Sequence, residues 1–403
     1  MMRRTILVVL IALSFNASAQ QTARKVIYII ADGISADAFE RENLPNFRKI
    51  ITEGSYSRMH VGGDKGTYNE TPTISAVGYN SLLTGTWVNK HNVPDNDIKD
   101  PNYNYPTIFR LFKEQFPQKK TAIFSSWTDN RTKLLGDRFR PDYAFDGYEL
   151  DTVRFKHDKL AAYMHQIDEE VVKQAAHTIR TNAPDLSWVY LEYTDDMGHR
   201  YGDSPEFRKA ISMLDVQVGR IWDAIKYRQE KLNEDWLIII TTDHGRDEET
   251  GRGHGGQSDR QRSTWMVSNY KNLNSYGQYF DLGIVDIMPS IAHFLDVKLP
   301  ESVEREVDGT SFIGPVSITG LKANYIQGLL DISWKALEKN GKAKIWIATT
   351  NNFKTGGKDS YKLLGTVDLS QQHFQADVKD YPSEFYKLVV EAPENTVNRW
   401  INL

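Results

Sequence analysis

Three apolar runs, rich in β-branched and aromatic residues, most constrain what this chain can fold into. They are Val26–Ala31, Trp188–Tyr193 and Trp236–Thr242, and longer segments with helical spacing separate them. Strands that are apolar at nearly every position indicate a sheet buried on both faces, which is typical of parallel strands covered by helices. We therefore expect residues 20–320 to form an α/β domain, a three-layer α/β/α sandwich with a largely parallel central sheet.

Hydrophobic periodicity predicts the remaining elements of this domain. Two of the expected helices end at glycines, Gly54 and Gly85, as is common just past the last helical turn. One further strand is expected at Thr121–Ser125. The expected helices are Pro45–Glu53, Ser75–Thr84, Thr107–Phe116, Lys156–Arg180, Glu206–Lys231 and Ile284–Leu295.

From about Lys322 onward the pattern changes to short strand candidates separated by glycine, asparagine, aspartate and proline. These candidates are Lys344–Thr349, Tyr361–Leu369, His373–Val378 and Glu384–Glu391. Their spacing resembles that of a small β-sandwich of the fibronectin type III or immunoglobulin kind. We therefore expect a small all-β domain at residues 321–403. Because no candidate ligand lies beyond Gly320, we also expect a chain that ends there to fold and bind metal.

The first 19 residues have the pattern of a secretory signal peptide. A basic start, Met1–Arg4, precedes the short apolar run Ile6–Ser14 and the small-x-small sequence Ala17–Ala19. We therefore expect an exported protein, periplasmic or secreted, whose mature chain starts at Gln20. An uncleaved signal anchor is the alternative, although the apolar run is too short to span a bilayer. No later apolar run is long enough to suggest a stable membrane span.

The absence of cysteine limits the chemistry of any site. It excludes disulfides, thiolate metal sites and cysteine nucleophiles, so a bound metal must be held by Asp, Glu, His or a hydroxyl. The formal net charge of -4 gives no general attraction to nucleic acid, and no duplex partner is expected.

Each of the three apolar runs is followed by an aspartate. Asp32-Gly33 follows the first, Asp195-Asp196 with His199 the second, and Asp243-His244-Gly245 the third. A single aspartate after a strand is usually a turn or cap residue. In a parallel sheet, however, the carboxyl ends of the strands meet at one edge, where ligands bind. Three such ends therefore predict a cluster of carboxylates and imidazoles.

The spacing within these motifs supports a metal site. Asp195 and His199 are four residues apart, so one helical turn brings both side chains to the same side. His254 lies among four glycines in residues 251–256, which would let the backbone approach a site closely. A mobile surface loop is the alternative for His254. Together the motifs give three aspartates and three histidines, a ligand set suited to zinc or a similar ion.

Ser75 is a candidate nucleophile at the start of an expected helix, after a run rich in proline and threonine. At that place its oxygen would face free backbone N–H groups and the positive end of the helix dipole, which favours a phosphoryl group. The alternative is that Ser75 only caps the helix. Thr71 and Thr73 are rival nucleophiles that spacing alone does not exclude.

These motifs resemble the alkaline phosphatase superfamily, and within it the nucleotide pyrophosphatase/phosphodiesterase branch. The resemblance covers about Lys25–Phe312. Counting from the family's Thr-Gly pair, here Thr84-Gly85, the nucleophile position falls on Ser75, and the asparagine that holds a phosphate oxygen falls on Asn96. The segments that carry the resemblance are Asp32-Gly33, Ser81–Gly85, Asp195-x-x-Gly198-His199, Thr242–Gly245, Val285–Ser290 and Asp308-Gly309.

The resemblance implies a hydrolase with two divalent metal ions, zinc by preference, that cleaves phosphodiester or pyrophosphate bonds through a phosphoserine intermediate. Its substrate would be a small phosphate ester or a nucleotide-like molecule. Asn96 is a neutral donor, which suits the single charge of a diester. The implied ligands of one ion are Asp195, His199 and His254, and those of the other are Asp32, Asp243 and His244, with Ser75 also contacting the metal.

The sequence departs from the phosphodiesterase branch next to the nucleophile. The usual nucleophile is threonine followed by an aromatic residue that stacks on a nucleobase, whereas Ser75 is followed by Ala76. Trp87 or Trp127 would then have to supply a stacking surface, although plain packing is the favoured role for both.

Three alternatives compete with the diesterase interpretation. The first is a phosphomonoesterase, because the Ser75-Ala76 pair is similar to that of alkaline phosphatases and because Lys90, Arg246 or Arg252 would favour a doubly charged monoester. Sulfatases are disfavoured because Val77 and Tyr79 stand where they need proline and arginine. A catalytically inactive binding protein of the cell envelope is the alternative from another class.

Overall fold

The computed structural model describes residues 23–136 and 138–403. The signal peptide predicted at residues 1–19 lies outside them. Within the described residues, every helix is too short or too polar to cross a bilayer.

In the described part of the chain, the central sheet has eight strands in the order β4-β3-β5-β1-β6-β7-β2-β8. From β4 to β6 all neighbours are parallel, β7 runs antiparallel to β6 and to β2, and β2 pairs in parallel with β8. The largely parallel sheet predicted from the apolar runs is therefore confirmed. The strand bounds are β1 Arg24–Ala31, β2 Ser55–His60, β3 Thr121–Ser125, β4 Tyr143–Phe145, β5 Leu186–Leu191, β6 Asp235–Thr241, β7 Ser263–Ser268 and β8 Leu282–Gly283.

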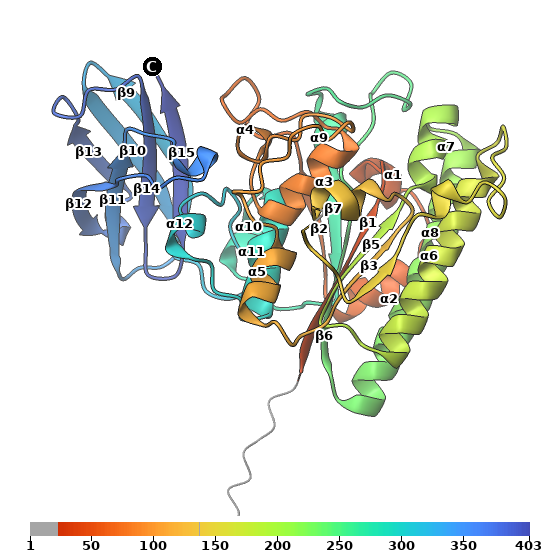
Figure 1. Cartoon of the computed structure of the whole chain (residues 1–403). Helices are drawn as coiled ribbons and strands as arrows, with labels where there is room; N and C mark the ends of the chain where they lie inside the picture. The colour runs from red at the N-terminus through yellow and green to blue at the C-terminus, as the bar shows by residue number, and fades with distance from the viewer. Residues whose placement is uncertain (1–22, 137) are drawn as a thin grey trace, which may run out of the picture.

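Helices cover both faces of this sheet (Figure 1). Alternate residues of β1 enter different cores: Tyr28 packs with α3, α5 and α11, whereas Ile29 packs with α2, α6 and α8. The three-layer prediction is thus confirmed. The helix bounds are α1 Ala36–Glu40, α2 Pro45–Glu53, α3 Ser75–Thr84, α4 Val88–His91, α5 Ile108–Gln115, α6 Ala162–Thr181, α7 Tyr193–Tyr201, α8 Pro205–Leu232, α9 Asp259–Arg262, α10 Ser275–Tyr279, α11 Ile287–Phe294 and α12 Glu301–Glu304, with short 3-10 or π turns at Asn130–Leu134, Tyr148–Leu150, Ile284–Asp286, Phe353–Thr355 and Leu369–Gln371.

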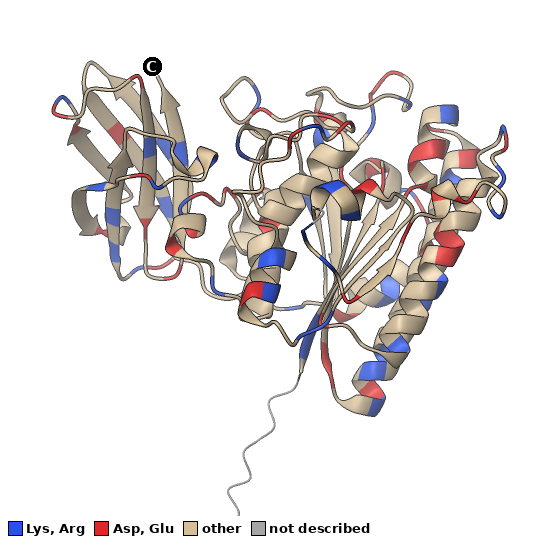
Figure 2. Ribbon diagram, in the orientation of Figure 1, with Lys and Arg blue, Asp and Glu red and all other residues tan. Residues whose placement is uncertain are grey.

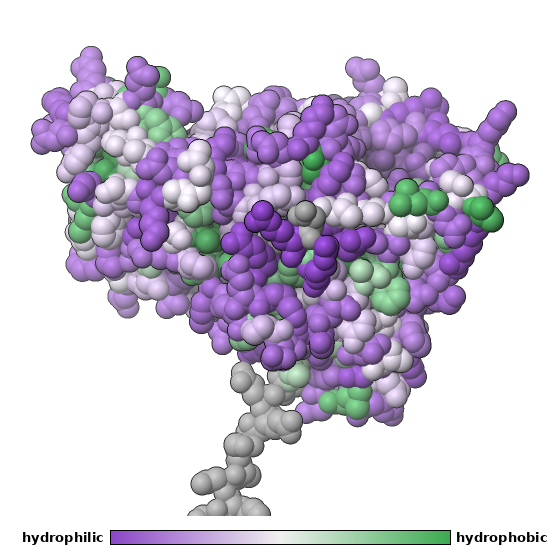
Figure 3. All heavy atoms as spheres, viewed as in Figure 1, coloured by the Kyte–Doolittle hydropathy of each residue, from purple (hydrophilic) through white to green (hydrophobic). Residues whose placement is uncertain are grey.

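Charged residues lie on the outer helices and in the loops, while the central strands carry few (Figure 2). The molecular face seen in Figure 3 is mostly hydrophilic and has only small, separated hydrophobic patches. This distribution is what a fold with both apolar layers inside requires.

Two predicted boundaries are wrong because side-chain caps set them, one from nearby in the sequence and one from a distant helix. The helix predicted from Lys156 begins only at Ala162, because the Asp158 carboxylate accepts the N–H groups of residues 160, 162 and 163 and fixes a turn there. The strand predicted to end at Tyr193 ends at Leu191. There the Asp168 carboxylate of α6 accepts the N–H groups of residues 192 and 193 and starts α7.

The Val285–Ser290 and Asp308-Gly309 signature has a structural explanation. The buried Asp286 carboxylate accepts bonds from Gly283 N at 2.7 Å, Thr310 N at 2.6 Å and the Tyr276 hydroxyl at 2.8 Å. Asp308 N donates to Gly85 O, at the left-handed residue that ends α3. The signature therefore ties α11 to the end of the Ser75 helix.

The C-terminal part of the chain forms two antiparallel sheets around their own core. Their orders are β13-β10-β9 and β12-β11-β14-β15. The four predicted strands correspond to β11–β14, and the prediction omitted β9, β10 and β15. β9 begins at Ile318, so the predicted domain boundary at 320/321 falls inside a strand, and the division into domains stays a prediction. The bounds are β9 Ile318–Ile326, β10 Leu329–Ala336, β11 Lys342–Ala348, β12 Lys362–Asp368, β13 His373–Asp377, β14 Phe385–Glu391 and β15 Thr396–Asn402.

Buried charges join this β-sandwich to the α/β part. The Lys387 ammonium of β14 pairs with Glu306 and, at 2.8 Å, with Asp359, and all three side chains are 2% exposed. Lys90 donates to Asp308 at 2.6 Å and to Asn398 of β15 at 2.8 Å. A chain that ended at Gly320 would lose Lys387 and Asn398, the partners of Glu306 and Lys90, and would uncover this charged surface, which argues against the independent folding expected from the sequence.

Replacing Lys387 by methionine is expected to lower the free energy of unfolding by about 3–5 kcal/mol, because two buried carboxylates lose their cation. Chemical denaturation of the full chain would measure this loss. Lys379→Met is the matched control: its ion pair with Asp377 is 65% and 57% exposed, so its loss should cost under about 1 kcal/mol. We call the contact between the β-sandwich and the α/β part, with its buried Lys90, Glu306 and Lys387, the seam. Equal denaturation midpoints for the two variants would show that the buried charges of this seam do not stabilise the protein.

Candidate active site

The six predicted carboxylate and imidazole ligands come together at the carboxyl edge of the neighbouring strands β5, β1 and β6. One aspartate directly follows β1, an aspartate and a histidine lie on α7 after β5, and an adjacent pair follows β6. The last histidine comes from the loop before α9. These residues form two groups, Asp195 with His199 and His254, and Asp32 with Asp243 and His244.

In the first group, two imidazole nitrogens and a carboxylate oxygen face one another. His199 Nε2 lies 3.2 Å from Asp195 Oδ2 and 3.1 Å from His254 Nε2. Asp195 and His199 are one turn apart on α7, as their spacing predicted. The His254 ring also stacks on His244 at 3.7 Å between ring centres, which brings the two groups together.

In the second group, His244 Nε2 lies 3.3 Å from each of three oxygens: Asp32 Oδ1, Asp243 Oδ2 and Ser75 Oγ. Two atoms that are each about 2.05 Å from a tetrahedral zinc ion are about 3.3 Å apart. The nitrogen–oxygen and nitrogen–nitrogen separations in both groups match this spacing.

Two buried oxygens in this group test whether a cation fits. Asp32 Oδ1 and Asp243 Oδ2 have no hydrogen-bond partner among the described residues, although their other oxygens are bonded. Buried carboxylate oxygens rarely stay unpaired in a folded protein. Both oxygens point at the shared position near His244, so the donor set fits a divalent ion.

The second group carries more negative charge than its imidazole balances. Burial alone would lower the pKa of His244, but the Asp243 and Asp32 carboxylates raise it to about 9. Burial and the Asp32 carboxylate raise the pKa of Asp243 well above its ordinary range. A divalent cation would pair with both carboxylates and leave His244 neutral.

The first group has a different electrostatic balance. Burial opposes ionisation of Asp195, but the Arg246 guanidinium lowers the pKa of this carboxyl. The hydrogen bond to Asp195 raises the pKa of His199. Burial and the nearby His244 lower the pKa of His254 to about 4, so its imidazole is neutral and able to act as a ligand.

Arg246 is a fully buried residue that the sequence suggested only as a substrate cation. Its Nη2 donates to Asp195 Oδ1 at 2.5 Å, and its Nε donates to Gly33 O at 2.9 Å. A Cβ at Gly33 or at Gly198 would lie 2.4 Å from its guanidinium. These two motif glycines therefore leave space for the Arg246 side chain, whose hydrogen bond fixes the Asp195 carboxylate.

Two tyrosines complete the surroundings of Asp32. The Tyr79 and Tyr190 hydroxyls both donate to Asp32 Oδ2, the latter at 2.7 Å. Tyr79 lies one turn after Ser75 on α3, and Tyr190 is near the end of β5. Tyr79 was not identified from the sequence as part of the site, although its helical spacing of four residues from Ser75 could have indicated it.

Ser75 is the first residue of α3, and Ile74 occupies the N-cap position. The alternative role of Ser75 as the N-cap is therefore wrong. The N–H of Ala76 donates to Asn96 Oδ1 at 3.0 Å. Asn96 thus lies at the start of α3, beside Ser75, and it occupies one of the helix N–H groups that we expected to be free.

The rival hydroxyls are occupied by backbone groups. Thr71 Oγ1 donates to Asn69 O at 2.8 Å, and Thr73 Oγ1 donates to Gly256 O and accepts from Gly255 N, both at 2.9 Å. Of the three hydroxyls, only that of Ser75 faces His244.

The other candidates named from the sequence lie outside the ligand groups. Trp87 is buried in the core, and Trp127 packs edge-on against Tyr79 at 6.3 Å. Lys90 is buried in the seam with the β-sandwich. Arg252 is exposed and lies two residues before His254.

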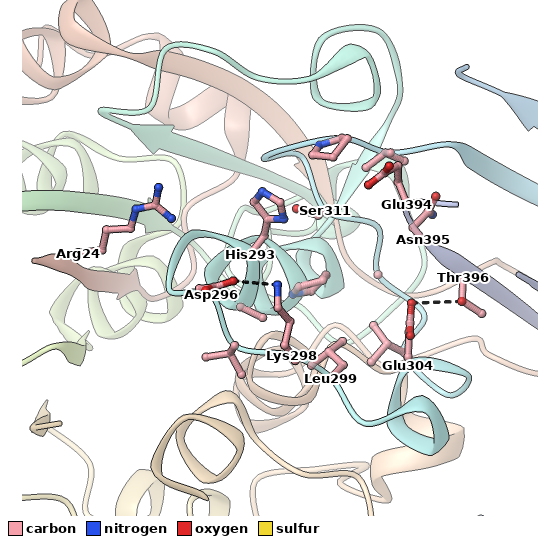
Figure 4. A pocket seen from close by; sticks show the side chains of 17 residues that line it. Arg24, His293, Asp296, Lys298, Leu299, Glu304, Ser311, Glu394, Asn395 and Thr396 are labelled. Atoms are coloured by element: carbon pink, nitrogen blue, oxygen red, sulfur yellow. Dashed lines mark hydrogen bonds and ion pairs between the residues drawn. The ribbon is translucent and has the colours of Figure 1, made fainter. Parts of the chain in front are cut away.

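A pocket of about 330 Å³ lies elsewhere, between α11 and the β-sandwich (Figure 4). His293 and Asp296 line it from the α11 side, Asn395 from the sandwich and Arg24 from the first residue of β1. Because Asp32 follows the other end of this eight-residue strand, the backbone of Arg24 lies about 25 Å from that of Asp32.

The model of the type I phosphodiesterase / nucleotide pyrophosphatase family matches residues 26–258. The chain belongs to this family. The matched range contains every residue predicted for the site, from Asp32 to His254. The predicted membership of the alkaline phosphatase superfamily and its phosphodiesterase branch is thereby confirmed.

Curated relatives are distant. The chain is 23% identical over 255 residues to an uncharacterized pyrophosphatase/phosphodiesterase of Schizosaccharomyces pombe, covering 58% of this chain and 47% of the relative. It is 26% identical over 243 residues to human ectonucleotide pyrophosphatase/phosphodiesterase family member 5, with the same coverages. A venom phosphodiesterase of Crotalus durissus collilineatus is 26% identical over 236 residues, covering 55% of this chain and 26% of the relative. The chain thus spans about half, or less, of these relatives.

Solved structures show the same fold. Human ectonucleotide pyrophosphatase / phosphodiesterase 5 aligns with a TM-score of 0.50 at 15% identity, covering 69% of this chain and 96% of the other. A 2-O GAG sulfatase aligns with a TM-score of 0.52 at 11% identity, covering 89% and 86%. At such identities the likeness concerns architecture alone.

Proposed function

We propose that this protein hydrolyses phosphodiester or pyrophosphate bonds, with Ser75 as the nucleophile at a two-zinc site. The observation that carries the proposal is the position of the Ser75 hydroxyl, 3.3 Å from His244 Nε2 and next to the two unpaired carboxylate oxygens. Family membership supports the reaction class. The test of the class is a panel of phosphate esters assayed with zinc-loaded protein.

Each ligand group would hold one ion. One ion would bind Asp195, His199 and His254, and the other Asp32, Asp243 and His244, beside Ser75 Oγ. When bound, two such ions supply the positive charge that makes an attacking hydroxyl more acidic and stabilises a departing oxygen. The ligand separations and the unpaired oxygens support this assignment.

Ser75 would act in two steps. Its hydroxyl loses its proton to solvent, and Oγ forms a bond to phosphorus while the opposite P–O bond breaks; the leaving oxygen keeps the electron pair and, in an alcohol, takes up a proton from solvent. Water then attacks the phosphoserine, the Oγ–P bond breaks, and a proton returns to Ser75. The products are the leaving alcohol or phosphate and a phosphomonoester.

The groups around the nucleophile favour the single charge of a diester over the double charge of a monoester. Asn96 binds the Ala76 N–H through its oxygen, which leaves its amide Nδ2 to donate to a phosphate oxygen. Of the three cations that would favour a monoester, Lys90 is buried in the seam and Arg246 is bonded to Asp195. Arg252 alone remains exposed beside the site.

We therefore expect a higher kcat/KM for bis-p-nitrophenyl phosphate than for p-nitrophenyl phosphate on the same preparation. Asn96→Ala should lower the diester kcat/KM by the equivalent of about 2–4 kcal/mol, the scale of one lost donor to a developing charge. Asn92→Ala is a control, because this nearby exposed asparagine bonds only Asp100 O through its side chain.

A monoester kcat/KM at least about tenfold above the diester value would instead favour a phosphomonoesterase. In that case Arg252→Ala should reduce the monoester activity more than Asn96→Ala does, because a second phosphate charge needs a cation.

A further inference from the structure

The segment of residues 62–74, which leads into Ser75, is a loop closed at its base. Thr71 N donates to Gly62 O at 2.9 Å. Inside the loop, the buried Asn69 carboxamide accepts bonds from Asp64 N at 3.0 Å and from the Thr67 hydroxyl at 2.6 Å. The loop is therefore compact, and its two sides contact different parts of the molecule.

The outer side of this loop rests on β15 of the β-sandwich. The Tyr68 ring stacks on the Trp400 ring, with 5.9 Å between centroids and 19° between planes. Arg399 reaches the same loop, with its guanidinium carbon 5.7 Å from the Tyr68 ring centre and Nη1 3.5 Å from Asp64 Oδ2.

Trp400 is itself held firmly. The residue is 8% exposed, and its ring packs edge-on against Phe385 at 5.5 Å. The ammonium groups of Lys90 and Lys387 lie 5.4 Å and 5.5 Å from the centre of this ring. The buried lysines of the seam therefore fix the ring on which Tyr68 stacks.

The inner side of the loop holds the His254 segment. His254 Nδ1 is 2.9 Å from Thr73 O, and Gln257 Nε2 donates to Thr71 O at 2.7 Å. A carbonyl only accepts, so Nδ1 carries the ring proton and Nε2 is left as the free ligand atom. Two residues after Thr73 the chain reaches Ser75.

We propose that Trp400 is a positioning residue, through which the β-sandwich holds the loop that aligns Ser75 and His254. The inference rests on the proposed function for the roles of those two residues, and adds a role for the sandwich. Three glycines with positive φ, Gly62, Gly63 and Gly66, give this loop conformational freedom that the Tyr68–Trp400 stack removes.

The test compares Trp400→Ala with Trp400→Phe in the full chain. Trp400→Ala should increase amide hydrogen exchange in residues 62–74 and 253–257 and lower kcat about 10- to 100-fold, with a smaller change in KM, because a small displacement of reacting groups is costly. Trp400→Phe retains a ring for Tyr68 and should therefore keep most of the protection from hydrogen exchange and most of the wild-type kcat. Trp346→Ala is the matched control: this seam tryptophan contacts Arg305 and Glu391 and should leave exchange in residues 62–74 unchanged.

Tyr68→Ala removes the same stack from the catalytic side and keeps the proposal testable if Trp400→Ala fails to fold. The double variant should lose no more than about twofold beyond the larger single loss, since both substitutions remove one contact. Unchanged exchange in both single variants, or fully additive losses, would overturn the proposal. Hydrogen exchange also distinguishes failure of this proposal from failure of the proposed function, because the exchange rates do not depend on which hydroxyl attacks.

Discussion

Ser75→Ala is expected to lower kcat by about 10³-fold or more, because the covalent step loses its nucleophile. Folding and metal content should be nearly unchanged, since the hydroxyl has only one close partner, His244 Nε2 at 3.3 Å. Steady-state kinetics with a diester, together with zinc analysis and thermal unfolding of the same preparation, would measure all three properties.

Two variants control for this experiment. Ser81→Ala removes another buried hydroxyl from α3, one that donates to Val77 O and bonds His91 Nε2 at 3.0 Å, and should keep kcat within a few-fold. Thr73→Ala should lose less than Ser75→Ala, because Thr73 only holds residues 255 and 256. An inactive Thr73→Ala beside an active Ser75→Ala would show that the other hydroxyl is the nucleophile.

Zinc analysis is expected to give about two equivalents per chain. His199→Ala or His254→Ala should each reduce this to about one, because a site with two remaining ligands binds zinc weakly while the group around His244 keeps its three. Activity should fall by at least about 10²-fold, and added zinc should no longer raise the melting temperature to the wild-type value.

His293→Ala is the matched control for the zinc experiment. This histidine is exposed in the pocket of Figure 4, away from the ligand groups, and its loss should leave two equivalents. Active protein that contains no metal, or full occupancy in both ligand variants, would contradict the two-site assignment.

The sequence was sufficient to predict where the candidate ligands meet. Asp32, Asp195 and Asp243 each follow an apolar strand closely, and parallel strands present their carboxyl ends at one edge. Spacing within one turn placed His199 beside Asp195. His254 was harder, because its place depends on bonds from its loop to Thr73, 181 residues away.

Boundaries failed where a side-chain cap decided them, and in one case the cap comes from a distant helix. No residue near Leu191 in the sequence indicates that the strand ends there, because the Asp168 carboxylate that starts α7 belongs to α6. β9, β10 and β15 escaped prediction because polar positions interrupt their apolar pattern.

The sequence by itself determined the parallel strands β3, β5, β1 and β6, the candidate ligand residues and the edge on which these lie, because strands, turns and helix spacing depend on residues close together in the chain. Only the tertiary structure decided that Arg246 holds Asp195, that Asn96 binds the start of α3, and that Trp400 supports the loop before Ser75. In the last of these contacts the partners are hundreds of residues apart. Their meeting depends on strand order and on how the β-sandwich docks, which no local pattern encodes.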